Sequence, residues 1–388
     1  MKIGVLTYHR AVNYGAFLQA YALCERLNQE EDVEAELIDF QCEKEVKLYN
    51  PYQLKKNLSW ILRKRNIRKI IDDIQKYSAF EHARKQMHLS SSHVISDDCE
   101  QFVQMVEGKY DVIIAGSDEI WKVNSYRGFP TPYWLIGDLG CRKFSYAASA
   151  RTSFAALSME NQNLLKSALS EFEYIGVRDE DTMSEVEKYT DRQERIHLCC
   201  DPSFLYEFHA NGQAGREVLR KRYHADNSKK WIGLMIRSPE IVTALRKRYG
   251  NQVELISLFE RNKGCINAVN LTPFEWMDVI AGLDFVITSY FHGMCFSIIN
   301  KTPFFSVDNR TDKKDGSKMF ELLEKEGMAD RYGRTEAECL ANGTLFKKAD
   351  KALAGEILDS NALVQRYREG FSGFLCCLKN ADCSRAGC

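Results

Sequence analysis

One histidine follows an apolar run that is typical of a buried strand. The run Phe285–Ile287 is followed by a polar turn, then by His292, Gly293 and the apolar, helix-like segment 294–299. In a parallel α/β sheet, ligands bind where a strand ends and the next helix begins. A helix N-terminus favours anions, and histidine exchanges protons near neutral pH. We therefore expect His292 to donate or accept a proton at a ligand site; the alternative is a histidine that packs in the core or caps the helix.

Basic side chains follow other predicted strands. Arg178 follows the apolar run 174–177, and Arg237 ends the predicted strand 231–237. The loop after the predicted strand 303–307 carries Arg310, Lys313 and Lys314. Cations at strand ends are suited to bind phosphate or carboxylate. The alternatives are a self-paired surface cluster around Arg178 and a solvated loop around the lysines.

Two loops in the first part of the chain offer polar side chains at strand ends. The predicted strand 2–7 leads into a loop with His9, Asn13 and Tyr14, and the strand 110–115 leads into Gly116, Ser117, Asp118 and Trp121. Glycine lets a backbone approach a ligand closely, and serine or aspartate binds a hydroxyl or caps a helix. The first loop is not a GxGxxG motif, so a dinucleotide is not indicated. A plain turn is the alternative for it.

Strand-like and helix-like segments alternate along both halves of the chain. This alternation predicts an α/β protein with two Rossmann-like domains and parallel sheets. Asp201 and Pro202 are expected at the crossing between the domains, because proline favours an extended preceding residue. We expect an N-terminal domain at 1–199, a second domain at 200–345, and a C-terminal part at 346–388. In that part a helix over 346–371 packs back on the first domain, before a cysteine-rich tail.

Several motifs, in the order found here, resemble those of the polysaccharide pyruvyl transferase family. They are Leu6–Ala22, Gly116–Trp121, Gly176–Glu180 with Cys200–Ser203, and the stretch around His292. The resemblance implies transfer of a pyruvyl group from phosphoenolpyruvate to hydroxyls of a sugar in a cell-surface polysaccharide or its precursor, forming a ketal. It also implies the GT-B arrangement, with two Rossmann-like domains facing a cleft, the first on the acceptor side and the second on the donor side.

The resemblance also implies roles for the residues at the strand ends. His292 would protonate the vinyl carbon of the donor, cations would bind its phosphate and carboxylate, and aromatic and polar groups would bind the sugar. No metal or cofactor is required, because phosphoenolpyruvate is itself the donor substrate. The expected donor-binding residues are Arg178, Arg237, Arg310, Lys313 and Lys314. The expected acceptor-binding residues are His9, Asn13, Tyr14, Gly116, Ser117, Asp118, Trp121 and Tyr290.

Position 290 departs from the family pattern. Well-described members carry Arg-x-His where this chain has Tyr290, Phe291 and His292. Either Arg310 or the nearby lysines replace the missing arginine, or the donor differs. Two alternatives therefore stay open: a GT-B glycosyltransferase that uses a nucleotide-sugar, and a non-catalytic sugar-binding protein of the same fold.

Composition and charge exclude several classes of protein. The 388 residues are 45% hydrophobic and 28% charged with a net charge of −1, which is typical of a soluble globular protein and does not indicate nucleic-acid binding. The N-terminal apolar run is too short for a signal peptide, and no run reaches the roughly 20 apolar residues of a membrane span. We expect a cytoplasmic protein with reduced thiols. The tail cysteines lack paired CxxC spacing, which favours free or redox-exchangeable thiols over a zinc site: Cys376, Cys377, Cys383 and Cys388.

A basic segment at 54–69 is expected to form the start of a long helix. It carries seven Lys or Arg residues before the first acid, Asp72, together with an apolar stripe. Such a helix binds anionic membranes, which would place the enzyme at the inner face of the membrane if its acceptor is lipid-linked. The alternative is a solvated helix on the surface of a domain.

Overall fold

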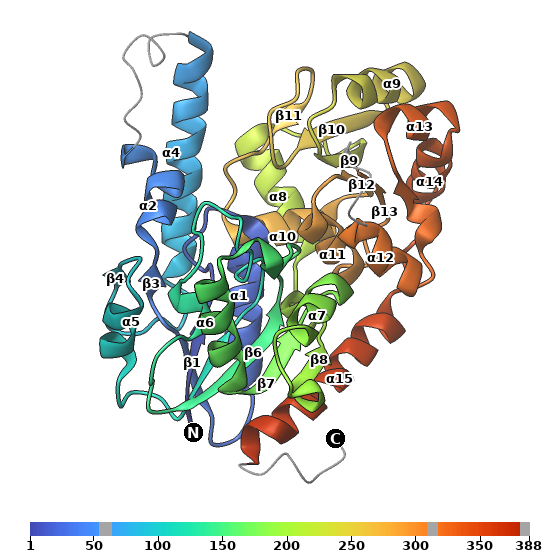
Figure 1. Ribbon diagram of the computed structural model, residues 1–388. Coiled ribbons are helices and arrows are strands. Elements are labelled where there is room, and N and C mark those ends of the chain that lie inside the picture. Colours follow the sequence, from blue (N-terminus) through green and yellow to red (C-terminus); the bar gives the residue numbers. More distant parts are fainter. Residues whose placement is uncertain (54–63, 309–316, 381–388) are drawn as a thin grey trace. The chain divides into compact units, whose positions relative to one another are not determined.

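The computed structural model describes residues 1–53, 64–308 and 317–380. Contacts within the chain divide it into two compact units, which are described separately. Unit 1 comprises residues 1–63, 84–207 and 367–388, and unit 2 comprises residues 64–83 and 208–366. Each unit has its own six-stranded parallel sheet (Figure 1).

The sheet of unit 1 has the strand order β2-β1-β5-β6-β7-β8, and all neighbouring strands are parallel. Strands covered on both faces need apolar residues throughout, and all four residues of β5, Val-Ile-Ile-Ala, are buried. A small parallel pair, β3-β4, belongs to the same unit. The strands are β1 (Lys2–Leu6), β2 (Glu34–Leu37), β3 (Phe40–Gln41), β4 (Val94–Ile95), β5 (Val112–Ala115), β6 (Arg142–Ala148), β7 (Phe172–Val177) and β8 (Ile196–Leu198). The helices are α1 (Tyr14–Asn28), α2 (Glu43–Tyr49), α5 (Cys99–Val106), α6 (Met159–Ser170) and α7 (Glu180–Glu187).

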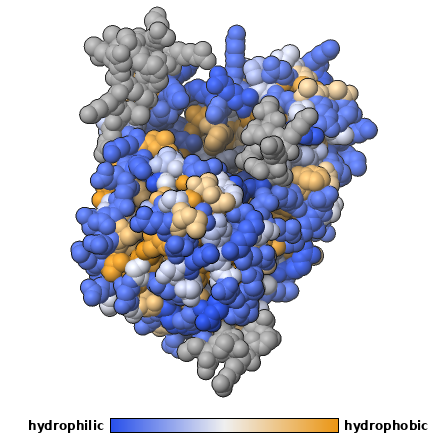
Figure 2. Space-filling view, in the orientation of Figure 1, coloured by the Kyte–Doolittle hydropathy of each residue, from blue (hydrophilic) through white to orange (hydrophobic). Residues whose placement is uncertain are grey.

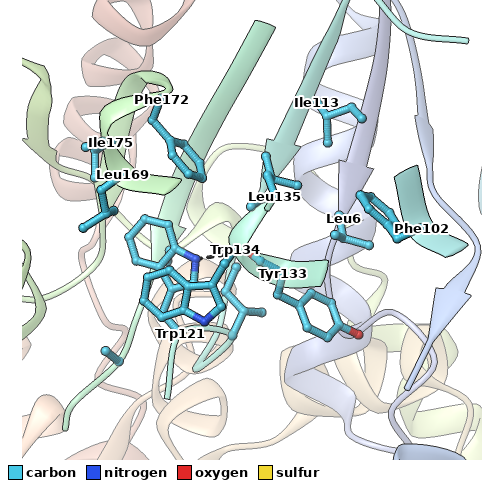
Figure 3. Packing of buried hydrophobic residues seen from close by; sticks show 14 of the residues in the cluster. Leu6, Phe102, Ile113, Trp121, Tyr133, Trp134, Leu135, Leu169, Phe172 and Ile175 are labelled. Atoms are coloured by element: carbon cyan, nitrogen blue, oxygen red, sulfur yellow. Dashed lines mark hydrogen bonds between the residues drawn. The ribbon is translucent and has the colours of Figure 1, made fainter. Parts of the chain in front are cut away.

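Stacked tryptophans lie in the hydrophobic core of unit 1. The rings of Trp121 and Trp134 are 4.8 Å apart with an angle of 9° between their planes, and Phe172 meets Trp121 edge-on (Figure 3). The indole N–H of Trp121 donates a hydrogen bond to the carbonyl oxygen of Tyr133, at 3.1 Å. These large buried rings hold the segment that follows β5 in place, because truncating one would leave a cavity.

The sheet of unit 2 has the order β11-β10-β9-β12-β13-β14, again parallel throughout. Helix α10 of this unit starts with a capping box formed by Thr272 and Glu275. The strands are β9 (Lys230–Met235), β10 (Val253–Ser257), β11 (Ile266–Asn267), β12 (Phe285–Thr288), β13 (Phe304–Val307) and β14 (Tyr332–Gly333). The helices are α4 (Lys64–Arg84, in this unit to Ala83), α8 (Gly212–Tyr223), α9 (Pro239–Tyr249), α10 (Pro273–Gly282), α11 (Phe291–Ile299), α12 (Lys318–Lys325), α13 (Glu336–Ala341) and α14 (Thr344–Leu353).

The C-terminal part differs from the single helix predicted over 346–371. The chain forms α14 and then α15 (Asn361–Lys379), with a break between them at Gly355, whose φ of 101° does not fit a helix. The end of α15 packs on unit 1, where Arg142 donates hydrogen bonds to the carbonyl oxygens of Leu378 and Cys377 at 2.7 and 3.1 Å. Residues 346–366 belong to unit 2, and residues 200–207 to unit 1.

Some predicted features lie outside the described residues. They are the basic loop with Arg310, Lys313 and Lys314, most of the basic segment 54–69, and the last two cysteines of the tail. On the face shown in Figure 2, the described surface is mostly hydrophilic, with hydrophobic residues in scattered patches. Across 1–53, 64–308 and 317–380, no helix is both long and apolar enough to cross a membrane.

Candidate functional site

The order of strands in unit 2 places a topological switch point at the carboxyl ends of β9 and β12. After β9 the chain adds β10 and β11 on one side, and it then returns to place β12 on the other side. At such a reversal the following loops and helices part in opposite directions, and ligands of open α/β sheets bind in the space left there. Arg237 follows β9, and Tyr290 and His292 follow β12. The structure thus brings three of the predicted site residues to one edge of one sheet.

Local contacts fix His292 on the first turn of α11. The hydroxyl of Thr288, at the end of β12, accepts a hydrogen bond from the backbone N–H of Tyr290 at 2.9 Å and turns the chain into the helix. Gly293 lets α11 lie directly on the strand ends, since a Cβ there would come within 2.5 Å of the Thr288 hydroxyl oxygen and 2.7 Å of the Met235 sulfur. The His292 side chain is buried, with 4% of its surface exposed.

Aromatic rings surround His292. The ring of Tyr290 lies 6.0 Å from the imidazole and the ring of Phe291 lies 5.3 Å from it. Tyr290 also stacks on Phe259, with ring centroids 4.8 Å apart. The ammonium group of Lys318, at the start of α12, lies 5.1 Å from the centre of the Phe291 ring. Stacked rings of this kind offer a flat apolar surface next to a group that can transfer a proton.

The loop after β10 carries Phe259 to this edge and is held by a buried asparagine. Asn262 donates hydrogen bonds to the carbonyl oxygen of Ile236 at 2.8 Å and to the hydroxyl of Ser257 at 3.0 Å. In the same loop Glu260 lies 3.8 Å from Arg237, and both side chains are at least half exposed. An exposed pair at this distance is weakly coupled, so Arg237 remains accessible to an anionic ligand.

Helix α4 brings an unpredicted lysine to the same place. The ammonium group of Lys76 lies 5.1 Å from the centre of the Phe259 ring, on the Phe259–Tyr290 stack. Desolvation lowers the pKa of Lys76 to about 8, although the carboxylates of Asp73 and Glu260 oppose this shift. Nothing in its sequence neighbourhood marked this residue, because α4 lies more than 180 positions before Phe259 in a stretch that reads as an ordinary charged helix.

The first sheet has a corresponding reversal between β1 and β5. The hydroxyl of Thr7, after β1, donates a hydrogen bond to the carbonyl oxygen of Ser117, after β5, at 3.1 Å. The Ser117 hydroxyl in turn donates to Gln19 of α1 at 2.7 Å. Gly116 permits this packing, because a Cβ there would lie 2.0 Å from the carbonyl oxygen of Tyr146. The structure therefore places the two predicted loops of unit 1 side by side, with Asn13 as the N-cap of α1.

His9 is buried in its loop. One ring nitrogen lies 3.1 Å from the carbonyl oxygen of Thr7 and the other lies 3.1 Å from the Asp39 carboxylate, which also binds Arg10. Burial lowers the pKa of His9, while the hydrogen bonds from Arg10 and His9 outweigh burial and hold the pKa of Asp39 below its usual range. In this structure His9 holds its loop together instead of facing the surface.

The predicted aromatic wall of the acceptor needs correction at two positions. Tyr14 and Trp121 have no exposed surface. Trp121 is enclosed by the cluster shown in Figure 3, and its one polar group is bound to Tyr133. A tryptophan after a strand reads the same in sequence whether it packs in the core or stacks on a sugar. Burial decides for the core here, and Tyr290 is the member of the predicted wall that stays partly exposed, at the switch point after β12.

Arg178 forms ion pairs with two carboxylates of unit 1. It lies in unit 1, where one guanidinium nitrogen donates to Asp201 at 3.0 Å and another lies 3.5 Å from Asp118. Burial would lower the pKa of Arg178, but these carboxylates raise it above its ordinary value. The side chain is 6% exposed. The alternative of an internal ion-pair cluster therefore describes Arg178 and Asp118 better than a role in binding the donor.

The described residues were also compared with the side-chain arrangements that bind metal ions. Among the residues that the structure describes, no group of three or more His, Cys, Asp or Glu side chains is arranged to hold a metal ion. Burial raises the pKa of the thiols of Cys199 and Cys200, which lie next to the hydroxyls of Tyr174 and Tyr146. Such thiols are poor nucleophiles and poor metal ligands.

Comparison with solved structures defines the class of fold. Along 97% of its length the chain is similar to Anabaena Alr3699/HepE in complex with UDP and glucose (99% of that chain, 12% identity, TM-score 0.55). It is also similar to the UDP-GlcNAc 2-epimerase from Methanocaldococcus jannaschii, over 97% of this chain and 99% of that chain, with 9% identity and a TM-score of 0.53. A third similar structure is the UDP-GlcNAc 2-epimerase from Neisseria meningitidis bound to UDP-GlcNAc, over 98% of this chain and 100% of that chain, with 8% identity and a TM-score of 0.50. These likenesses and the two parallel sheets confirm the predicted GT-B-like α/β fold.

Sequence comparison then gives the family. The family model for polysaccharide pyruvyl transferases matches residues 13–311, and the chain belongs to this enzyme family. No curated protein matches the chain in sequence. The match begins at Asn13, at the end of the first loop of unit 1, and covers the loop after β5 and the His292 stretch of unit 2.

Proposed function

We propose that this protein transfers a pyruvyl group from phosphoenolpyruvate to two hydroxyls of a sugar in a cell-surface polysaccharide or its precursor. The observation that carries the proposal is the placement of His292, which Thr288 and Gly293 hold at the switch point between β9 and β12. Membership of the family supports the reaction class. Ketal formation cannot begin without a proton donor, and an imidazole beside an anion-binding edge is suited to that role.

The reaction needs one proton transfer to carbon and the loss of phosphate. His292 protonates the CH2 carbon of phosphoenolpyruvate, which becomes the methyl group, and one sugar hydroxyl adds to the adjacent carbon. The C–O bond to phosphate then breaks, and a second hydroxyl completes the ketal. One hydroxyl proton replaces the proton lost by His292, and the other leaves with phosphate. Cations that bind the departing phosphate lower the barrier, and the proposed ones are Arg237 with Arg310, Lys313 and Lys314 of the loop beyond β13.

In unit 2 the aromatic surface of Tyr290 is proposed to bind a sugar ring, and in unit 1 the loops after β1 and β5 are proposed to offer hydrogen-bonding groups for sugar hydroxyls. In those loops the side chains of Asn13 and Asp118 are partly exposed, and Gly116 and Ser117 shape the backbone. A sugar bound through one aromatic face and a few hydrogen bonds is the usual pattern for such sites. A lipid-linked acceptor would keep the protein at the inner face of a membrane, which we include in the proposal.

Titration separates this function from its alternatives. We expect phosphoenolpyruvate to bind the purified protein and UDP-GlcNAc not to bind. The reverse result would favour the nucleotide-sugar transferase on the same fold; UDP-GlcNAc is named for two of the structural neighbours. Binding of neither would favour the non-catalytic sugar-binding protein.

Substitution of His292 tests the catalytic role. We expect His292→Asn to retain its melting temperature within a few degrees and to lose about 10²- to 10⁴-fold in single-turnover rate, with a smaller change in donor affinity. His224→Asn is the matched control, because His224 is exposed at the end of α8 with φ of 57°, a conformation that asparagine tolerates. A destabilised His292→Asn with normal activity per folded molecule would make this histidine structural.

A further inference from the structure

Helix α4 is fixed to unit 2 although the strands of unit 1 flank it in sequence. Two guanidinium nitrogens of Arg261 donate hydrogen bonds to the carboxylate of Asp72, one of them at 2.7 Å. One turn along, the amide of Asn270 donates to Gln75 at 2.6 Å. These two contacts set the rotation of the helix about its axis. They thereby determine which of its side chains faces the loop after β10.

The side chain placed there is Lys76. A series of ring contacts joins it to the catalytic candidate: its ammonium lies over Phe259 at 5.1 Å, Phe259 stacks on Tyr290 at 4.8 Å, and Tyr290 lies 6.0 Å from His292. The aromatic pair removes water from one side of the ammonium group. A cation in such a position interacts more strongly with a second charge than a fully solvated one does.

Lys76 has two carboxylates and a second cation in its surroundings. Asp73 on its own helix and Glu260 on the loop after β10 both attract the ammonium group. Glu260 is shared with Arg237, which lies 3.8 Å away and is 60% exposed. Two cations thus stand near Glu260, one on α4 and one after β9. A phosphate has several acceptor oxygens and can pair with both cations, whereas the single carboxylate of Glu260 holds Arg237 only loosely.

We propose that Lys76 is a substrate-binding residue, whose ammonium group pairs with a phosphate of the donor bound at the carboxyl ends of β9 and β12. The inference rests on the proposed function for the site but not on the identity of the donor, because phosphoenolpyruvate and a nucleotide-sugar both present phosphate. The proposal gives α4 a role in the reaction, because Lys76 is a donor-binding cation that comes from this helix and not from the end of a strand.

The proposal predicts a pH dependence of binding. The pKa of Lys76 is lowered to about 8, so the free site loses this positive charge at mildly alkaline pH. The groups that face it, from α4, the loop after β10 and the end of β9, are Asp73, Glu260 and Arg237, with His292 beyond Tyr290. Donor affinity should therefore fall between pH 7 and 9.5 through Lys76.

Three variants test the role of Lys76: Lys76→Met, Lys76→Arg and the control Lys69→Met. Lys69 is exposed on the same helix, two turns away. Phosphoenolpyruvate, UDP-GlcNAc and inorganic phosphate are titrated separately at pH 7 and pH 9.5. We expect Lys76→Met to weaken binding of the phosphate ligand about 10- to 100-fold at pH 7 and to remove most of the pH dependence. Lys76→Arg should bind well at both pH values, because its charge persists.

The outcomes separate this inference from the proposed function. If UDP-GlcNAc binds instead of phosphoenolpyruvate and the binding depends on Lys76, the role of Lys76 stands and the pyruvyl-transfer function fails. If phosphoenolpyruvate binds equally to wild type, Lys76→Met and Lys69→Met, the function stands and the role of Lys76 is overturned. If none of the three phosphate compounds binds the wild-type protein, both are overturned.

Discussion

Removing the charge of Lys76 should stabilise the folded protein near neutral pH. The pKa of Lys76 is about 8, against 10.5 for an ordinary lysine. At 1.36 kcal/mol for each pKa unit, holding the protonated form in this position costs the folded state at most about 3.4 kcal/mol. The side chain keeps some exposed surface, and Lys76→Met also loses a cation–π contact of about 0.5–1 kcal/mol. We therefore expect Lys76→Met to gain about 1–2 kcal/mol in free energy of unfolding at pH 7.

The sign of the effect depends on pH in a defined way. Below pH 8 lysine is protonated in both the folded and unfolded states, so the full cost applies and the variant has its full advantage. Between pH 8 and 10.5 the folded state gives up the proton first, and the advantage shrinks. Above 10.5 both states are neutral and the advantage is gone. The difference between wild type and variant should therefore narrow as pH rises through this window.

Thermal unfolding of wild type, Lys76→Met and Lys69→Met at several pH values from 7 to 10.5 measures this difference. We expect a rise of roughly 2–6 °C in melting temperature for Lys76→Met at pH 7, which narrows at higher pH, and no change for Lys69→Met. A residue that keeps a charge at a cost in stability is typical of a functional site. A loss of stability in Lys76→Met at pH 7, or a gain that does not vary with pH, would refute the reasoning and leave Lys76 as a structural contact of α4.

Two further predictions concern residues that the sequence placed at ligand sites or surfaces. Arg178→Met should destabilise the protein by about 3–5 kcal/mol, because the buried Asp201 loses its cation, while phosphoenolpyruvate affinity of the folded protein is unchanged; normal stability with lost affinity would restore a donor role. The start of α4 exposes Ile67 and Ile71 together with Arg68 and Lys69, so the protein should sediment with anionic vesicles but not neutral ones at low salt. If equal amounts of protein sediment with both vesicle types, the segment is a solvated helix and not a membrane-binding one. The double variant Arg68→Glu, Lys69→Glu, which reverses both charges, is the control.

The sequence alone determined the fold class, the family and the position of His292. Apolar runs that end in polar turns are local patterns, and parallel strands of this kind are recognised from a few neighbouring residues. The same runs located the two loops of unit 1, since polar residues after β1 and β5 are adjacent to those strands in sequence. His292 and Gly293 could be read together because the glycine that lets α11 approach β12 stands next to the histidine.

Only the tertiary structure decided which candidates are buried. His9, Tyr14, Trp121 and Arg178 have residue types suited to a ligand site, but all four are largely buried, and three of them have partners outside their own motif: Asp39 for His9, Trp134 for Trp121, and Asp201 for Arg178. The contribution of α4 was equally invisible, because Lys76 meets Phe259 across more than 180 residues of sequence. Spacing within a segment reports which face of a helix or strand is apolar. It does not report which distant segment covers that face, and burial and pairing between distant segments determine whether a side chain is free to meet a substrate.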